Sequence, residues 1–334
     1  MNVYLENGYI NMDAILDSDT VFWFIVGGRA IGKTYGALNS TRQRGLFVMY
    51  LRRTQTQCDL ISKPEMSPYK SINKDFGTDI TIKPITKYNG GIYDGDNIIG
   101  YTGALSTISN MRSFDASNVD VIIYDEFIPE RHERPIKAEA SALWNAYETI
   151  SRNRELKGLA PTKLLCLANA NDLGNQIFID LGLVDRADRM RATGEQLFID
   201  KARSLAVFMP TDSPISAAKA DTSLYKLTRG TDFSDVAIEN DFTGIDRENI
   251  KSRALNDYKP VALLGELCIY RHRRRRDYYI SRHKSGSPEV FPMTEAGKKR
   301  FLHAHGDIYR AYLTNSIHYE SALCEVIISR VLGI

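Results

Sequence analysis

The sequence predicts an α/β protein in which roughly the first 200 residues form a three-layer domain, a parallel sheet between helices. Five short apolar runs are rich in β-branched or aromatic residues and too short for buried helices. They lack strict alternation, which is typical of strands covered on both faces. Helical spacing of apolar residues follows two of them, at 34–44 and 138–150. The predicted strands are 21–26, 46–51, 119–124, 164–168 and, more weakly, 205–209.

The rest of the chain differs from this pattern. Residues 80–104 carry Asn-Gly-Gly and Asp-Gly-Asp between apolar pieces, which predicts an antiparallel hairpin or meander at the edge of the main sheet. Past residue 244, helix-like segments at 247–257, 308–313 and 319–331 and strand-like segments at 261–270 and 278–281 predict a small α+β domain. We therefore expect a main α/β domain at 1–199, a polar linker with room for one short helix at 200–243, and a C-terminal domain at 244–334.

The composition is that of a globular protein. Of 334 residues, 43% are hydrophobic and 25% charged, which excludes a disordered chain or a fibrous repeat. Residues 260–334 hold 12 Lys and Arg against 7 Asp and Glu, whereas the first 259 hold 31 against 34, so a polyanion would meet the C-terminal part. No apolar run approaches 18 residues, and the four cysteines form no C-x-x-C pair. We expect a soluble, intracellular protein with buried free thiols and no membrane contact.

Residues 27–34 match the phosphate-binding pattern G-x-x-x-x-G-K-[ST] completely, between a predicted strand and a predicted helix. Glycines let backbone N–H groups converge on phosphates, and the N-terminus of the following helix adds partial positive charge. The lysine is expected to reach the β- and γ-phosphates of ATP, and the threonine hydroxyl to bind Mg²⁺. The expected nucleotide-binding residues here are Gly27, Gly28, Arg29, Ala30, Ile31, Gly32, Lys33 and Thr34.

A second ATP-site element is expected at the end of another buried strand. Asp125 and Glu126 follow VIIY; Asp125 is predicted to hold Mg²⁺ through water, and Glu126 to polarise the attacking water as general base. The alternative is a pair of helix-capping acids, but Pro129 follows closely. The guanine-specifying pattern N-K-x-D is absent from the sequence, which argues against a switch GTPase.

Other polar residues allow two interpretations each. Asn169, after LLCLA, is either a γ-phosphate sensor or a turn residue. Arg152 and Arg154 follow a predicted helix and are either an arginine finger for a neighbouring subunit or cations that stabilise the helix C-terminus. Arg112 has the same ambiguity. Arg52 and Arg53, after the second strand, could contact nucleotide or DNA or pair with acids on the domain surface, and they remain unassigned.

The order of GGRAIGKT, YLRR, VIIYDEF, SRNRE and LLCLANAND resembles the DNA-packaging ATPases of phi-29-type tailed phages. Arg29, third in its loop, also resembles packaging motors and large terminase subunits. The resemblance covers the ATPase half closely and the remainder only in layout. It implies an additional-strand, conserved-glutamate (ASCE) ATPase that uses ATP and Mg²⁺. It implies a homopentameric ring on the portal (connector) of an empty prohead in the host cytoplasm, driving double-stranded DNA inward, in some members with a structural packaging RNA.

The resemblance also implies roles for single residues. Lys33 and Thr34 match the loop lysine and hydroxyl, and Asp125 and Glu126 the metal-binding and catalytic acids. Arg152 matches the trans-acting finger, with Arg154 beside it, and Arg112 a second basic position that faces the neighbouring site. The family has a basic residue where this chain has Gln55, so any role of that charge is in doubt.

The resemblance implies a C-terminal domain like an RNase H nuclease that has lost its chemistry. Acids beside its predicted strands and last helix, Glu266, Asp277 and Glu325, form no cluster in the sequence, so nuclease activity is not expected. An arginine run stands there instead and suits contact with nucleic-acid phosphates, the alternative being a solvated turn. Its arginines are Arg271, Arg273, Arg274, Arg275 and Arg276.

Two other functions compete with a packaging motor. A terminase-like motor would also cut DNA, and Mn²⁺-dependent nicking would reveal it. A nucleotide-gated DNA-binding or loading ATPase would hydrolyse ATP only to gate assembly, so DNA-stimulated turnover with sustained translocation separates a motor from it.

Overall fold

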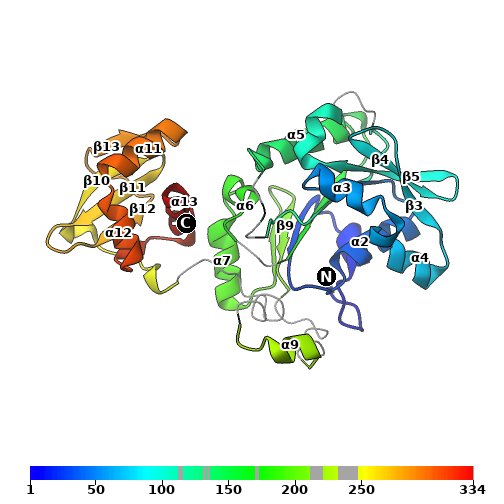
Figure 1. Cartoon of the computed structure of the whole chain (residues 1–334), viewed down its shortest axis with the longest axis horizontal. Coiled ribbons are helices and arrows are strands. Elements are labelled where there is room, and N and C mark those ends of the chain that lie inside the picture. Colours follow the sequence, from blue (N-terminus) through cyan, green and yellow to red (C-terminus); the bar gives the residue numbers. More distant parts are fainter. Residues whose placement is uncertain are drawn as a thin grey trace. The chain divides into compact units, whose positions relative to one another are not determined.

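The computed structural model describes residues 1–111, 116–130, 133, 136–169, 173–210, 221–231 and 247–333. The chain divides into two compact units, each with its own sheet and core (Figure 1). The first comprises Met1–Asp180 and Arg189–Thr243, the second Leu181–Asp188 and Gly244–Ile334, so the division falls inside α7 (Val184–Thr193). Among the described residues, no helix has the length and apolarity that a membrane span requires.

The first unit is built on a sheet that has nine strands within the described residues, in the order β3-β4-β5-β2-β6-β7-β1-β9-β8. The strands from β5 to β9 in this order pair in parallel, which confirms the predicted parallel sheet. The β3-β4-β5 meander is antiparallel and lies at one edge, also as predicted. The bounds are β1 Phe22–Val26, β2 Val48–Arg52, β3 Ile80–Pro84, β4 Asn89–Asp94, β5 Asn97–Ala104, β6 Val121–Asp125, β7 Lys163–Ala168, β8 Leu197–Asp200 and β9 Leu205–Phe208.

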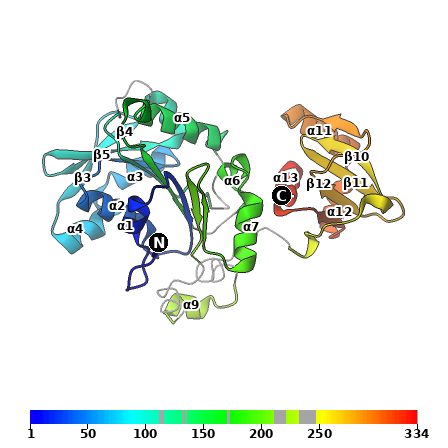
Figure 2. The same ribbon diagram turned by 180° about the vertical axis from the view of Figure 1, so that it is seen from behind.

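Helices cover both faces of this sheet (Figure 2). On one face Trp23 and Ile25 of β1 share a core with Leu38 of α2 and Ile72 of α4. On the other face the ring of Phe24 packs edge-on against Phe178 of α6, with centroids 5.9 Å apart. The helices are α1 Met12–Asp17, α2 Lys33–Gln43, α3 Gln55–Ile61, α4 Lys70–Phe76, α5 Glu139–Ser151, α6 Gln176–Asp180 and α9 Ser223–Leu227, with 3-10 turns η1 Pro64–Met66, η2 Leu105–Met111 and η3 Glu155–Lys157.

The main sheet extends past the domain boundary expected at residue 199. β9 lies inside the predicted linker, where the weakly predicted strand 205–209 falls, and it pairs with β1 next to the edge strand β8. All four residues of this short strand are apolar and buried. The segment therefore belongs to the core, although the residues around it in the sequence are polar. Residues 211–220 and 232–243 of the predicted linker lie outside the described part of the chain.

The described residues of the second unit form a five-stranded sheet in the order β13-β10-β11-β12-β14, with helices packed on one face. Two segment predictions were wrong here. The predicted strand 261–270 is a hairpin, because Gly265 adopts a φ of 57° in a two-residue turn. The predicted helix 247–257 is two 3-10 turns, since Ile250 and Lys251 pair with Tyr319 instead. The bounds are β10 Tyr258–Leu264, β11 Leu267–His272, β12 Tyr278–Ser281, β13 Glu289–Phe291, β14 Ile317–Tyr319, α11 Glu295–Ala304, α12 Asp307–Leu313, α13 Ala322–Leu332, η5 Arg247–Asn249 and η6 Leu255–Asp257.

Candidate functional site

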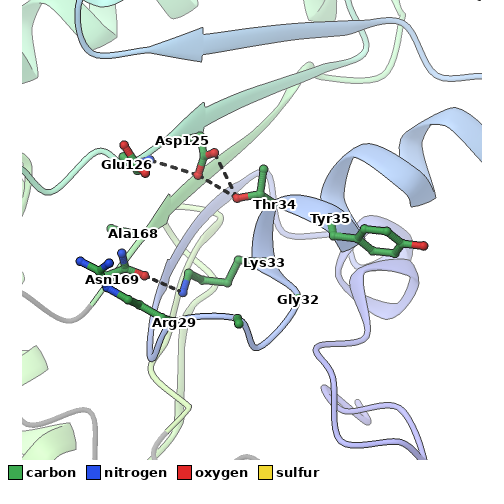
Figure 3. Close-up of a pocket in the computed structure, with 10 residues that line it drawn as sticks. Arg29, Gly32, Lys33, Thr34, Tyr35, Asp125, Glu126, Ala168 and Asn169 are labelled. Carbon is green, nitrogen blue, oxygen red and sulfur yellow. Dashed lines mark hydrogen bonds between the residues drawn. The ribbon is translucent and has the colours of Figure 1, made fainter. Parts of the chain in front are cut away.

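The predicted phosphate loop connects β1 to α2 at the carboxyl edge of the sheet, where open α/β sheets bind their ligands (Figure 3). Two of its glycines are required by geometry. Gly32 adopts a φ of 87°, and a Cβ on Gly27 would come within 2.6 Å of the Pro210 ring. Gly32 precedes α2 without a side-chain cap, so the helix N-terminus presents backbone N–H groups to the pocket. A phosphate group fits this cradle.

Lys33 is buried in this pocket and points back across the loop. Its Nζ donates to the backbone oxygens of Gly27 at 2.9 Å and Gly28 at 2.6 Å. It also donates to Oδ1 of Asn169 at 3.2 Å. Asn169 comes directly after β7, the strand next to β1, so strand order brings these two predicted residues together. An ammonium held at this point is placed to contact an anion in the loop.

Thr34 and Asp125 also meet in the pocket. The Thr34 hydroxyl lies 3.1 and 3.0 Å from the two carboxylate oxygens of Asp125. The Tyr50 hydroxyl donates to Oδ2 of Asp125 at 2.7 Å. Hydroxyl and carboxylate oxygens are ligands that Mg²⁺ prefers, and a nucleotide-bound Mg²⁺ needs only one or two protein ligands besides phosphates and water. The described residues contain no group of three or more His, Cys, Asp or Glu that could hold a metal by themselves.

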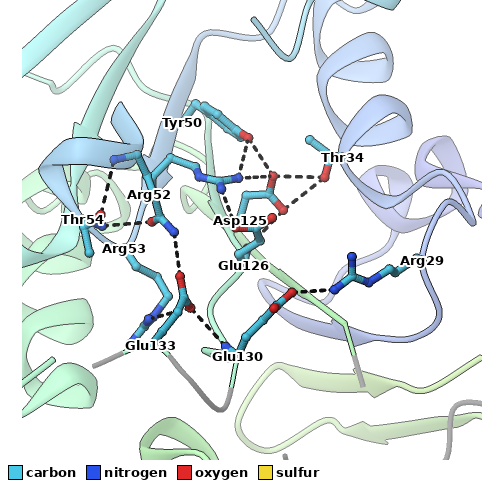
Figure 4. A network of polar contacts seen from close by, with 11 residues as sticks. Arg29, Thr34, Tyr50, Arg52, Arg53, Thr54, Asp125, Glu126, Glu130 and Glu133 are labelled. Carbon is cyan, nitrogen blue, oxygen red and sulfur yellow. Dashed lines mark hydrogen bonds and ion pairs between the residues drawn. The ribbon is translucent and has the colours of Figure 1, made fainter. Parts of the chain in front are cut away.

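Arg52, which the sequence left without a role, reaches both acids (Figure 4). Its Nη1 lies 3.1 Å from Oδ2 of Asp125, and its Nη2 forms an ion pair with Glu126. Burial raises the pKa of the Glu126 carboxyl; Arg52 opposes that shift, and the charge of Asp125 adds to it. Because β2 pairs with β6, the residue that ends β2 lies beside the acids that end β6. The only sequence signal was the position of Arg52 at the end of a predicted strand.

Two further arginines fix the chain after β6. Arg29 of the phosphate loop forms a 2.5 Å ion pair with Glu130. Arg53 is fully buried and holds Glu139 through Nε and Nη2, at 3.1 and 3.3 Å, and Glu133 through Nη1 at 3.2 Å. A buried arginine needs such partners, because removing them would leave an uncompensated charge. The segment after Glu126 is therefore tied both to the phosphate loop and to β2 (Figure 4).

Two of the predicted finger residues, Arg152 and Arg154, lie away from the pocket of their own chain. Arg152 follows α5 with a φ of 38°, and its Nε donates to the Thr149 oxygen in the last helical turn. Arg154 donates to the Val119 oxygen at 2.6 Å and pairs with Asp120 at 3.0 Å. Val119 and Asp120 precede β6, whereas the pocket lies at the other end of that strand. Arg112 lies outside the described residues.

The arginine run forms the end of β11 and the turn to β12 in the second unit. Arg271 lies 3.7 Å from Asp307, and Arg275 lies 3.1 Å from Asp277. His272 Nδ1 accepts from the backbone N–H groups of Arg274 and Arg275, both at 3.1 Å, which shapes the turn. Three exposed arginines of this run have no ion-pair partner within the described residues: Arg273, Arg274 and Arg276.

The acids considered for a nuclease centre occupy separate environments. Glu266 lies 3.5 Å from Arg282, and Asp277 pairs with Arg275. Glu325 is buried on α13. They form no metal-binding group within the described part of the chain.

Fold and site together define a mixed α/β protein with a polar, phosphate-compatible pocket at the carboxyl edge of a large parallel sheet. The chain belongs to the family of podovirus DNA encapsidation proteins (Gp16), whose model matches residues 6–263. It is 25% identical over 251 residues to the DNA packaging protein of Bacillus phage phi29, covering 74% of this chain and 69% of that protein.

Two solved structures share its fold. One is the bacteriophage Phi-29 viral genome packaging motor assembly, with a TM-score of 0.70, 19% identity, and coverage of 97% of this chain and 99% of that one. The other is the Phi-28 gp11 DNA packaging motor, with a TM-score of 0.64, 17% identity, and coverage of 98% and 99%.

Proposed function

We propose that this protein is an ATP-hydrolysing motor that moves double-stranded viral DNA into an empty prohead. Membership in the DNA encapsidation family supports the process. The observation that carries the ATPase part is the convergence of Lys33, Thr34, Asp125 and Glu126 around one pocket at the carboxyl edge of the sheet. These residues come from two sequence regions about 90 residues apart, so their convergence depends on the fold.

The ASCE assignment is supported by strand order. β7 lies between β1, which precedes the phosphate loop, and β6, which carries the acids. An additional strand at that position is the feature for which the class is named. Glu126, directly after the metal-binding candidate, supplies the glutamate in the name.

Each residue then has a defined task in the pocket. The loop backbone and Lys33 hold the ATP phosphates, with Asn169 orienting the Lys33 ammonium. Thr34 and Asp125 would hold Mg²⁺, which would neutralise charge on the phosphates when bound. Glu126 accepts the proton of the attacking water, and its raised pKa makes it a stronger base than an exposed glutamate.

The protein also acts on adjacent subunits and on nucleic acid. Arg152 acts on the ATP of the next subunit in a homopentameric ring, with Arg154 and Arg112 as the other finger candidates. The unit from residue 244 on, for which an RNase H-like fold stays a prediction, contacts nucleic-acid phosphates through the arginine turn without cutting. The partners are double-stranded DNA, the prohead portal and, in some relatives, a structural RNA, all within the host cytoplasm.

A defined packaging assay tests this proposal. Purified proheads, phage DNA, the full chain and ATP should yield DNA protected from DNase, and Glu126→Gln protein should yield none. Hydrolysis stimulated by DNA without protected DNA would favour the loading ATPase instead. Nicked DNA after incubation with Mn²⁺ would favour the terminase-like nuclease.

A further inference from the structure

A short loop after α5 carries two leucines that face solvent. Leu156, in the η3 turn, is 85% exposed, and Leu159 is 53% exposed. Single exposed leucines are common on protein surfaces, but two within four residues on a tight turn make a compact apolar point. Charged neighbours surround it: Arg152 and Lys157 outweigh Glu155. We call residues 152–159 the leucine loop.

A second pocket lies beside the nucleotide pocket and has an apolar wall. Thr34 and Asp125 line both pockets, so the two share a boundary. Leu60 and Met66 are 39% and 57% exposed at this wall. We call it the side pocket; its lining residues are Thr34, Tyr50, Arg52, Gln57, Leu60, Ile61, Met66, Pro68 and Asp125.

The charges next to the two surfaces are complementary. Asp59 precedes Leu60 and Glu65 precedes Met66, and both acids are exposed, as are two lysines of the same stretch, Lys63 and Lys70. Asp125 and Glu126 add two acids at the inner end, against Arg52. The leucine loop is net basic and the side pocket net acidic, so opposite charges would meet if the apolar groups came together.

The leucine loop cannot reach the side pocket of its own chain. Arg154 fastens the loop to Val119 and Asp120, before β6 begins. The side pocket contains Asp125, at the other end of that strand. At about 3.3 Å per residue, the five residues of β6 separate the two surfaces by roughly 15 Å. Two different complementary surfaces at opposite edges of one molecule favour a head-to-tail contact between copies.

We propose that the leucine loop of one copy docks into the side pocket of the next, with Leu156 between Leu60 and Met66. Lys157 then faces the acids beside the wall. Arg152, four residues from Leu156, lies next to Thr34 and Asp125 of the neighbour, where the two pockets meet. This last point rests on the proposed function, because it gives the predicted trans-acting finger its route to the neighbouring ATP.

Thiol cross-linking of the full chain tests the contact. The four native cysteines are buried, so engineered surface thiols react selectively. Leu156→Cys protein mixed with Met66→Cys protein, under mild oxidation with ATP and Mg²⁺, should give a covalent dimer. The double variant should give a ladder, because each copy can link in both directions. Leu227→Cys is the matched control, since this α9 leucine is 82% exposed and absent from the leucine loop.

A dimer yield from Leu156→Cys and Met66→Cys no higher than from Leu227→Cys and Met66→Cys would overturn the docking. Leu156→Asp should independently weaken self-association roughly 10- to 100-fold in sedimentation, the cost of losing one buried leucine. Unchanged association would also overturn it. ATP binding, measured for every variant, separates the docking proposal from the proposed motor function. Variants that bind ATP and package DNA but do not cross-link contradict only the docking. Wild-type protein that binds no ATP contradicts the motor.

Discussion

Arg52 and Glu126 are 74 positions apart in the sequence and form an ion pair in the pocket. The contact exists because β2 and β6 are neighbours in the sheet and both end at its carboxyl edge. The same guanidinium also contacts Asp125, so one buried cation serves both acids of the proposed ATP site. The charge state of Glu126 therefore depends on Arg52 as well as on its own burial.

Replacing Arg52 with Gln should change the pH dependence of ATP hydrolysis. Arg52 lowers the Glu126 pKa against burial and the Asp125 charge, both of which raise it. Without Arg52 that pKa rises further. Because Glu126 must be ionised to act as base, the acid limb of the rate profile should move to higher pH. Steady-state rates from mildly acidic to alkaline pH measure this shift.

The matched control is Arg44→Gln, at a surface arginine that pairs with Asp13 and Asp17 far from the pocket. Its pH profile should coincide with that of wild type. A profile of Arg52→Gln that also coincides would mean that Arg52 does not act on Glu126 during turnover.

Lys33→Ala and Glu126→Gln should fail at different steps. Losing Lys33 removes a charge-assisted phosphate contact, so ATP should bind roughly 10- to 100-fold more weakly. Glu126→Gln keeps the shape of the pocket, so ATP should bind nearly as in wild type while turnover falls by about 10²- to 10⁴-fold. A binding titration and a phosphate-release assay separate the two. Normal turnover in Glu126→Gln would remove Glu126 from its role as base.

Local sequence signals were enough to predict part of this site. The phosphate loop, β1, α2 and β6 follow from a motif and from apolar runs confined to a few neighbouring residues. The edge meander was predicted from its Asn-Gly and Asp-Gly sequences, of which only the second is a turn, at Gly95, whereas Asn89 and the two glycines after it lie inside β4. The roles of Arg52 and Arg53 could not be predicted, because each depends on a strand or helix paired from elsewhere in the chain.

The two errors in the second unit have different origins. An apolar run predicts strand conformation but does not show where it reverses, and the turn at Gly265 divides the predicted strand into β10 and β11. Residues 250–251 have helix-compatible composition, yet the edge of β14 offers backbone partners that the isolated segment lacks. Pairing with a distant segment, which local composition does not encode, decided the second case, whereas the first was decided by a local two-residue turn.

Arg152→Ala should impair the ATP site of a neighbouring subunit while leaving ATP binding intact. Because the side chain lies at the end of α5 away from its own pocket, its loss should not disturb that pocket. Mixtures of Arg152→Ala and Glu126→Gln proteins should recover part of the hydrolysis, since some interfaces then join an intact Arg152 to an intact Glu126. No recovery on mixing would contradict action in trans.

Arg154→Ala serves as the comparison. Its side chain holds Val119 and Asp120, so its loss should lower the melting temperature. Mixing Arg154→Ala protein with Glu126→Gln protein should restore no ATP hydrolysis beyond that of the Arg154→Ala molecules that are folded. A lowered melting temperature in Arg152→Ala but not in Arg154→Ala would reverse the roles assigned to the two arginines.

The arginine turn should bind nucleic-acid phosphates through Arg273, Arg274 and Arg276, which have no ion-pair partner among the described residues. Duplex DNA affinity should fall with salt at a slope of about −0.9 per phosphate neutralised, with little sequence preference.

Replacing Arg273, Arg274 and Arg276 together with Gln should lower both affinity and slope. Replacing Arg271 and Arg275, already paired with Asp307 and Asp277, should change the slope less. Both variants of the full chain should hydrolyse ATP normally without DNA. Equal slopes in wild type and the triple variant would mean that the turn faces a protein partner instead of DNA.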